Sequence, residues 1–219
     1  MTEQLVIFAK YPIPGTVKTR LAAQIGAEPA AKLYSRFIEY ILDTMTRRRT
    51  AEKVVVAVTP PDSVNRFARR FPGADRYEAQ LPADDLGNRM LAVFQEASNN
   101  HVKKTVIIGT DSPTLPADYV LEAFSRLESH DVVLGPAKDG GYYLIGAKKP
   151  HPELFEDIPW STARVLEKTI AALDRLRLRY ALLPEYFDVD EVADLHQLYR
   201  MAPEIFSGLE MPSHLSFSL

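Results

Sequence analysis

The feature that most constrains this chain is the alternation of short β-branched runs with longer segments of helical periodicity. Strand-like runs are expected at residues 5–9, 53–58, 75–80, 105–108, 132–134, 140–146 (a loop entering a strand) and 180–183. Helical patterns are expected at residues 29–48, 62–70, 85–97, 117–127, 161–173 and 190–199. This order predicts an α/β fold, in which a mostly parallel sheet is covered by helices on both faces.

The boundaries of these elements carry a few local signals. Ser161 is a candidate N-cap, because its hydroxyl could accept an unpaired backbone N–H at a helix start. Asp84 or Asp85 could cap the helix at 85–97 in the same way. No internal repeat or linker is visible, so we expect a single domain over residues 1–219.

Composition excludes several classes of function. The net charge of −3 argues against general binding of nucleic acid, which usually requires a basic surface. The absence of cysteine excludes disulfides, thiolate metal sites and cysteine nucleophiles. No run approaches the roughly 20 apolar residues of a membrane span, and no signal peptide is visible. We therefore expect a soluble, cytoplasmic protein, and small anionic ligands remain possible because a local cluster of Lys and Arg suffices to bind them.

An acidic residue stands directly after the most clearly buried strand. Residues 105–108 are followed by Gly109, Thr110 and Asp111, so the carboxylate lies past the carboxyl end of the strand. Ligands of open α/β sheets bind at that edge. Asp111 could hold Mg²⁺, which prefers carboxylate, water and phosphate oxygens, or it could serve as a cap or turn residue.

The loop after the first strand has the composition of a phosphate-binding loop. Cations, hydroxyls and a glycine gather there within one short stretch: Lys10, Gly15, Thr16, Lys18, Thr19 and Arg20. Point charges from Lys, the fork of Arg and close backbone approach at Gly all suit a phosphate group. The order is not that of a Walker A loop, and the alternative is a solvated basic loop.

Two further loops are candidates for ligand contact. Arg89 lies near a helix start, where it could contact a phosphate or form a surface ion pair. Gly140 and Gly141 allow close approach to a ligand, but Asp-Gly is also a common hairpin turn. One of Tyr142 and Tyr143 could stack on a base or sugar, although core packing is the simpler role.

Paired carboxylates precede the last helix. Asp188 and Asp190 are two residues apart in an extended stretch, so their side chains point to the same side. They could grip a cation together. Asp190 could also cap the helix that follows.

Taken in order, these motifs resemble a known bacterial family. They are Phe8-Ala9-Lys10 through Lys18-Thr19-Arg20-Leu21, residues 85–90, residues 109–113, residues 134–146, Trp160-Ser161-Thr162 and Asp188-Val189-Asp190. The family consists of small GT-A-fold transferases of the nucleotide-diphospho-sugar transferase superfamily, and the resemblance covers about residues 5–195. It implies a three-layer, Rossmann-like GT-A sheet.

The family has relatives with two kinds of chemistry. The likeness to glycosyltransferases implies that Asp111 is a metal ligand for a nucleotide sugar. The likeness to phospholactate and molybdopterin guanylyltransferases implies that Lys18 and Arg20 hold a triphosphate, and that Asp111, Asp188 and Asp190 hold metals. The chain lacks the Asp-x-Asp motif of the first group at its central strand. It also lacks the Gly-Gly loop that molybdopterin guanylyltransferases carry after strand one.

The leading hypothesis is a metal-dependent transferase with a nucleotide sugar as donor. Asp111, with Asp188 or Asp190, would hold Mg²⁺ or Mn²⁺, Lys18 and Arg20 would neutralise the leaving diphosphate, and Asp139 would act as general base. Further contacts to the nucleotide are expected from Ala9, Lys10, Gly15, Thr19, Arg89, Gly109, Thr110, Gly140 and Gly141.

Two alternatives stay open at this point. One is nucleotidyl transfer from a nucleoside triphosphate to a small phosphorylated acceptor. The other is a non-catalytic nucleotide-binding protein. The sequence leaves the base, the sugar and the acceptor open, and it fits either a monomer or a homodimer. The carboxyl-terminal apolar residues could cover a partner or close the core: Phe206, Leu209, Met211, Leu215 and Phe217.

Overall fold

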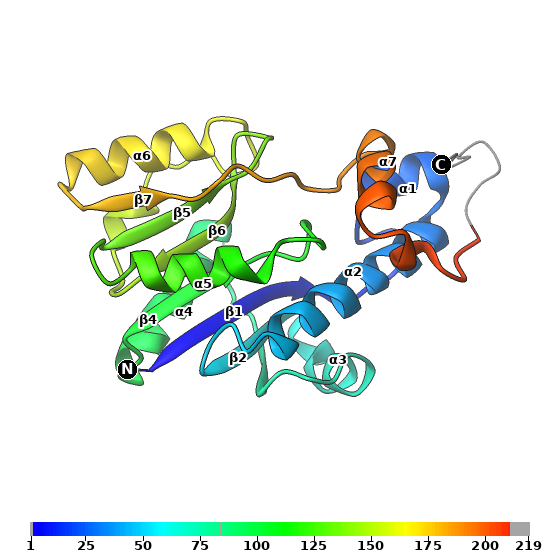
Figure 1. Cartoon of the computed structure of the whole chain (residues 1–219), viewed down its shortest axis with the longest axis horizontal. Coiled ribbons are helices and arrows are strands. Elements are labelled where there is room, and N and C mark those ends of the chain that lie inside the picture. Colours follow the sequence, from blue (N-terminus) through cyan, green and yellow to red (C-terminus); the bar gives the residue numbers. More distant parts are fainter. Residues whose placement is uncertain (1, 84, 211–219) are drawn as a thin grey trace.

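The computed structural model describes residues 2–83 and 85–210, and within them one sheet of seven strands has the order β3-β2-β1-β4-β6-β5-β7. The strands are β1 (Glu3–Lys10), β2 (Lys53–Thr59), β3 (Arg76–Ala79), β4 (Lys104–Ile108), β5 (Val132–Pro136), β6 (Tyr142–Ala147) and β7 (Tyr180–Leu182). Neighbouring strands are parallel except at β6, which is antiparallel to both β4 and β5. The predicted α/β class with a mostly parallel sheet is confirmed (Figure 1).

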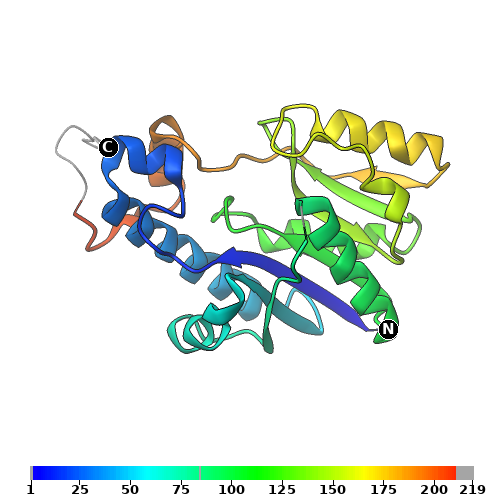
Figure 2. The same ribbon diagram turned by 180° about the vertical axis from the view of Figure 1, so that it is seen from behind.

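Helices cover both faces of this sheet. They are α1 (Thr19–Ile25), α2 (Ala27–Arg47), α3 (Val64–Arg70), α4 (Leu86–Asn99), α5 (Ala117–Arg126), α6 (Val165–Arg175) and α7 (Val192–Met201). Figure 1 shows α2 and α5 in front of the sheet, and Figure 2 shows α4 and α6 on the opposite face. This is the three-layer arrangement that the resemblance implied.

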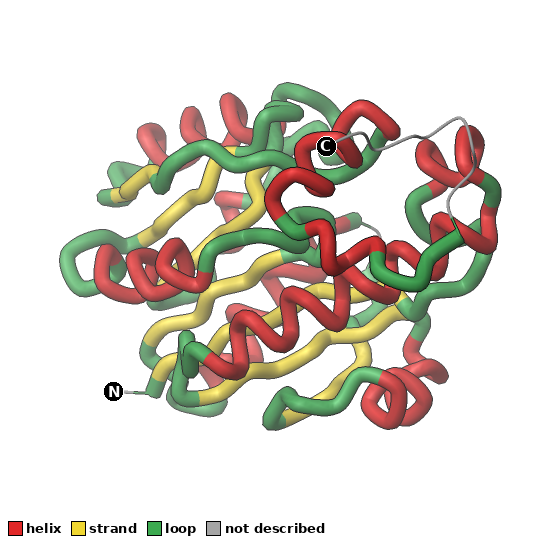
Figure 3. The backbone as a smooth tube through the Cα atoms, turned by 45° about the vertical axis from the view of Figure 1, so that its right-hand side comes forward, coloured by secondary structure: helices red, strands yellow, loops and turns green. Residues whose placement is uncertain are grey.

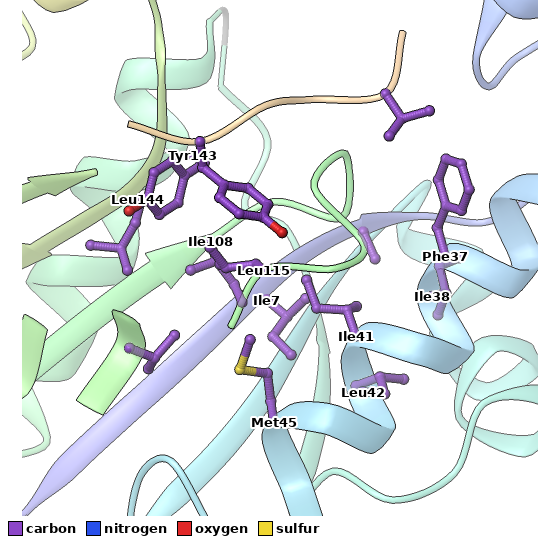
Figure 4. Packing of buried hydrophobic residues seen from close by; sticks show 14 of the residues in the cluster. Ile7, Phe37, Ile38, Ile41, Leu42, Met45, Ile108, Leu115, Tyr143 and Leu144 are labelled. Carbon is purple, nitrogen blue, oxygen red and sulfur yellow. The ribbon is translucent and has the colours of Figure 1, made fainter. Parts of the chain in front are cut away.

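The two layers of core follow from the alternation of side chains along each strand. Ile7 of β1 packs in the cluster that includes α2 and α5, whereas its neighbour Val6 packs with α4 and α6. Figure 4 shows Ile41 and Met45 of α2 directed towards Ile7 and Leu115. Because both faces of each central strand are apolar, the polar groups of β1 and β4 are confined to their ends.

One extended stretch, residues 183–191, runs from β7 to α7, and we call it the connecting segment. Figures 1 and 3 show it passing from the sheet to the region of α1 and the start of α2. It stays hydrogen-bonded to the sheet region along its way: Tyr186 N–H donates to Pro136 O at 3.0 Å, and Val189 N–H donates to Asp111 O at 2.8 Å. The segment therefore brings Asp188 and Asp190 to the loop that follows β4.

Two local predictions are wrong, and one helix was not predicted. The N-cap role of Ser161 is wrong, because α6 begins only at Val165 and Ser161 has a φ of 64°, outside the extended conformation of an N-cap. The capping role of Asp190 is also wrong, since Glu191 is the N-cap of α7. The helix α1 was not predicted, because seven residues show too little periodicity to be recognised.

The helix cap at α4 and part of the carboxyl terminus agree with the sequence analysis. Asp85 caps α4, and its carboxylate accepts the N–H of Asn88 at 2.8 Å. Asp84 lies outside the described residues. Phe206 is buried in the core and Leu209 packs against it, while Met211, Leu215 and Phe217 lie outside the described residues. Within residues 2–83 and 85–210, no helix has the length and apolar character needed to cross a membrane.

Candidate active site

A cleft of about 470 Å³ lies at the carboxyl ends of β1 and β4. Most of the predicted site residues line it: Ala9, Lys10, Lys18, Thr19, Arg20, Arg89, Gly109, Thr110, Asp111, Asp188 and Asp190. Gly15, Asp139, Gly140 and Gly141 are not among the lining residues. The volume is within the range of small-molecule sites in proteins.

Lys18 is the charged centre of the cleft. Its side chain is only 4% exposed, and its ammonium forms ion pairs with Asp111 and with Asp190, the latter at 3.0 Å from Nζ to Oδ1. Burial lowers the pKa of Lys18, but the two carboxylates raise the pKa more, so the net shift is upward. Lys18 is therefore a permanent cation in this cleft.

The backbone at Lys18 is held in an unusual conformation. Lys18 has a φ of 46° in the left-handed region, directly before the first residue of α1. Non-glycine residues seldom adopt this region, and such strained positions gather at functional sites. The strained backbone conformation of Lys18 is consistent with a role in directing its ammonium at Asp111 and Asp190.

Asp190 serves two cations at once. Besides Lys18, it contacts Arg20, with 3.6 Å between Nη1 and Oδ2. The Arg20 side chain is 69% exposed, so it can turn towards a ligand without losing buried contacts. Lys18 and Arg20 thus converge on one side of the cleft.

Asp111 and Asp188 form a second pair of neighbours. The Asp188 carboxylate accepts a hydrogen bond from the Ser112 hydroxyl. Burial, with the nearby charges of Asp111 and Asp139, raises the pKa of Asp188 to about 6 against the lowering effects of Ser112 and Lys18. Two neighbouring carboxylates of which one has a pKa raised by the charge of the other favour the binding of a cation between them.

The donor set fits a divalent metal of the magnesium type. Mg²⁺ is commonly held by one or two carboxylates, with water and phosphate oxygens completing its shell. Asp111 and Asp188 supply two such carboxylates in one cleft. No group of three or more Asp, Glu, His or Cys residues with metal-binding geometry occurs in the described part of the chain. The two carboxylates therefore suit a metal ion whose remaining ligands include phosphate oxygens of a bound molecule.

Tyr34 is a site residue that the sequence did not reveal. Its buried hydroxyl accepts the N–H of Lys10 at 3.1 Å and shares a hydrogen bond of 2.7 Å with the Thr110 hydroxyl. Burial, together with the charge of Asp111, raises its pKa to about 12. Tyr34 thus joins the loop after β1 to the loop after β4. It lies within the apolar stripe of α2, so periodicity marks it only as a core residue.

Gln80 is a second such residue, at the end of β3. Its amide nitrogen donates to the carbonyls of Ala9 and Ala57, at 3.3 and 3.0 Å. Its oxygen accepts from Nη1 of Arg89 at 3.4 Å. Gln80 therefore fixes the end of β1 and orients Arg89 at the same time. Its only signal in the sequence is a polar residue at the end of a strand-like run.

The glycine loop after β5 has a packing role. Gly140 has a φ of +87°, and a Cβ atom there would overlap the backbone of Ala163. Asp139 is exposed, and its carboxylate accepts the N–H of Gly141 at 2.8 Å. The strands β5 and β6 pair antiparallel across this turn, in agreement with the hairpin interpretation. Tyr143 is buried in the core, and Tyr142 is half-buried at the edge of the cleft.

Residues 41–162 match a family described as "Uncharacterized protein conserved in bacteria (DUF2064)". The chain belongs to the DUF2064 family. A comparison of this DUF2064 protein with the curated proteins gives no match.

Solved structures resemble this DUF2064 protein over nearly its whole length. A protein from Desulfovibrio desulfuricans G20, named as a candidate nucleotide-diphospho-sugar transferase, is 36% identical, with a TM-score of 0.85 over 92% of this chain and 88% of that one. The inositol-1-phosphate CTP transferase from T. maritima is 15% identical, with a TM-score of 0.63 over 95% and 98% of the two chains. The 4-diphosphocytidyl-2C-methyl-D-erythritol synthase from Anaerococcus prevotii DSM 20548 is 10% identical, with a TM-score of 0.60 over 93% and 99%.

The first of these structures supports the family assignment, and the other two show a shared fold. The predicted resemblance to the nucleotide-diphospho-sugar transferase superfamily is confirmed. The fold itself does not decide between the chemistries that it carries, because function depends on the site.

Proposed function

We propose that this protein is a metal-dependent nucleotidyltransferase that joins a nucleoside triphosphate to a small phosphorylated acceptor and releases pyrophosphate. The observation that carries this proposal is the position of Lys18. Its buried ammonium stands between Asp111 and Asp190, beside Arg20, at the edge of the sheet where β1 and β4 end. A polyphosphate needs such fixed positive charge next to a metal-binding carboxylate.

The reaction would proceed by displacement at phosphorus. A phosphate oxygen of the acceptor attacks the α-phosphorus, and a new P–O bond forms there. The bond from the α-phosphorus to the bridging oxygen breaks, and pyrophosphate leaves with that electron pair. Lys18 and Arg20 would neutralise the charge that builds up on the leaving pyrophosphate.

Asp111 and Asp188 would hold Mg²⁺ or Mn²⁺ against the phosphate oxygens. When bound, the metal supplies Lewis-acid stabilisation of charge on the phosphate chain. Asp190 has a different set of contacts, to Lys18 and Arg20. We therefore assign to Asp190 the positioning of these two cations, ahead of a role as a metal ligand.

The nature of the acceptor is supported by the surroundings of Asp139. A phosphorylated acceptor is already an anionic nucleophile, so it needs no general base. Asp139 was the candidate base, and its exposed carboxylate is bound to Gly141 N–H outside the lining of the cleft. The similar fold of an inositol-1-phosphate CTP transferase also supports a small phosphorylated acceptor.

Glycosyl transfer from a nucleotide sugar is the second candidate, favoured by the name of the 36% identical relative. The same cations and carboxylates would hold the diphosphate of the donor. An acceptor hydroxyl would then need a base, and Asp139 would have to be brought to it by movement of the turn. A non-catalytic nucleotide-binding protein is the third alternative.

The test is a calorimetric titration in the presence of Mg²⁺ or Mn²⁺. GTP, CTP and UTP are compared with UDP-sugars and GDP-sugars. Preference for a triphosphate, followed by pyrophosphate release with phosphorylated acids or phosphorylated sugar alcohols, supports nucleotidyl transfer. Preference for a nucleotide sugar would overturn it in favour of glycosyl transfer. Binding of a triphosphate without pyrophosphate release on any acceptor of these classes would point to the non-catalytic alternative.

A further inference from the structure

Arg89 enters the cleft from a different side than the cations that face the phosphates. It lies on α4, on the opposite face of the sheet from α2 (Figure 2), whereas Lys18 precedes α1, which packs against α2. Among the described residues, no hydrogen bond or ion pair connects Arg89 to Lys18, Arg20 or Asp111. The cleft thus has two separate sets of donors.

The orientation of the Gln80 amide is fixed by its neighbours. Two backbone carbonyls, those of Ala9 and Ala57, face its nitrogen, and a carbonyl can only accept. The amide oxygen must therefore face Arg89, and both N–H groups of Gln80 are already used. The Gln80 oxygen and the carbonyl of Ala9 are engaged as well. This corner of the cleft consequently offers a ligand donors, and few acceptors.

The guanidinium of Arg89 has an unused edge. Its Nη1 bonds to Gln80, while its Nε–H is buried and has no hydrogen-bond partner among the described residues. No carboxylate in the described part of the chain pairs with it. A buried donor without a partner is costly, and an acceptor on a bound ligand would satisfy it. The edge of Nε and Nη2 is the one that binds two adjacent acceptors side by side.

The lining of the cleft includes apolar side chains, two of them on α4 with Arg89, and these fit a planar group. Phe8, Leu86, Met90 and Tyr142 line the cleft. Leu86 is a large apolar side chain and is 46% exposed in the free protein. A phosphate would require further cations here, whereas a nucleobase would cover Leu86 with its flat face. The surroundings therefore favour a base over a phosphate.

We propose that Arg89, positioned by Gln80, reads the nucleobase and selects a base whose edge presents two adjacent acceptors. Guanine offers N7 and O6 in this arrangement, and cytosine offers N3 and O2. Adenine offers one acceptor beside an amino group, which would meet another donor. The inference rests on the proposed function, since it requires that the cleft binds a nucleotide.

The experiment compares nucleotides with a probe that has no base. Wild-type protein with Mg²⁺ is titrated with GTP, CTP, ATP and inorganic tripolyphosphate, and the same series is repeated with Arg89→Lys. We expect GTP or CTP to bind about tenfold to a hundredfold more tightly than ATP, from one bidentate contact. Arg89→Lys should remove most of this preference and leave tripolyphosphate binding unchanged. Whether GTP or CTP binds better identifies the base.

A matched control and a second variant keep the result interpretable. Arg126→Lys alters an exposed arginine of α5 that pairs with Glu122, and it should change none of the affinities. Gln80→Met retains the length of the side chain but frees Arg89, and it should lower the preference for GTP or CTP over ATP. If the preference persists in a folded Gln80→Met variant, Gln80 is not the positioning residue and the proposal fails in that part.

Two outcomes would overturn the inference while the proposed function stands. One is equal affinity of wild-type protein for GTP, CTP and ATP. The other is a parallel loss of nucleotide and tripolyphosphate binding in Arg89→Lys, which would make Arg89 a phosphate contact. Failure of the proposed function looks different, because wild-type protein would then prefer a nucleotide sugar to every triphosphate, or bind a triphosphate without releasing pyrophosphate on any phosphorylated acceptor.

Discussion

The ammonium of Lys18 pairs directly with the carboxylate of Asp111, so the loop after β1 and the loop after β4 meet in one ion pair. In the free protein this contact neutralises a carboxylate that we assign to metal binding. A bound metal ion would compete with Lys18 for Asp111, and the ammonium would then be available to a phosphate. The pair thus connects binding of the metal to binding of the nucleotide.

Replacement of Lys18 by Met tests the role of this cation. We expect the affinity for the preferred nucleotide to fall about tenfold to a hundredfold, the usual value of a hydrogen bond to a charged group. Isothermal titration in Mg²⁺ measures it. Lys32→Met, which changes an exposed lysine of α2, is the matched control. Equal affinity of the Lys18 variant and wild type would place the polyphosphate elsewhere.

Replacement of Asp111 by Asn tests the metal. The amide keeps the shape of the side chain but removes the charge that a hard divalent ion requires. We expect nucleotide affinity in the variant to become nearly independent of Mg²⁺, and titrations with and without EDTA measure this. Asp118→Asn, at a side chain that is 73% exposed on α5, should retain the dependence. Undiminished metal dependence in Asp111→Asn would remove Asp111 from the site.

The raised pKa of Asp188 predicts that the stability of the metal-free protein depends on pH. Its pKa is raised from 3.8 to about 6 by burial, so between these values the folded protein holds a proton that the unfolded chain has lost. The contribution of Asp188 to the free energy of unfolding therefore falls as the pH rises from about 4 to about 6, and it is constant above.

Asp188→Asn isolates this contribution, because the amide cannot ionise. The free energy of unfolding of the variant, minus that of wild type, should increase by about 1–3 kcal/mol across the same pH window. Urea unfolding in EDTA at pH 4.5 and 7.5 measures the difference. Parallel stability curves for the two proteins would contradict the raised pKa.

Gly87 tests the packing at the start of α4. It lies in the first turn of α4, and a Cβ atom there would overlap the indole of Trp160. Alanine favours a helix by about 1 kcal/mol over glycine, whereas overpacking costs about 1–3 kcal/mol. We expect Gly87→Ala to destabilise wild type but to stabilise the Trp160→Ala variant. A double-mutant cycle by urea unfolding measures the change of sign, and additive effects would show that the two residues do not interact.

The elements of the sheet were predictable because burial on both faces leaves long apolar runs in β1, β2 and β4. The position of the cleft was predictable as well, since parallel strands direct their carboxyl ends to one edge. Lys18, Asp111 and Asp188 were therefore identifiable as candidates from their places after strands and in loops.

Other features depend on contacts that a sequence does not contain. The role of Gln80 arises from the pairing of β3 beside β2, and that of Tyr34 from the packing of α2 over two loops. Ser161 has the composition of a helix cap, yet its loop turns in the left-handed region and α6 starts later. In each case tertiary contacts decide between local preferences that the sequence leaves open.

The contacts between the connecting segment and Lys18 can form only late in the synthesis of these residues. Lys18 is synthesised first, and its partner Asp190 follows 172 residues later. By then the strands β1 to β7 have all been synthesised, so most of the sheet can form on a nascent chain whose ion pairs to Asp190 are still missing. Only a chain that has been synthesised past Asp190 can hold Lys18 and Arg20 in place, and a shorter one would have the cleft without its positioned cations.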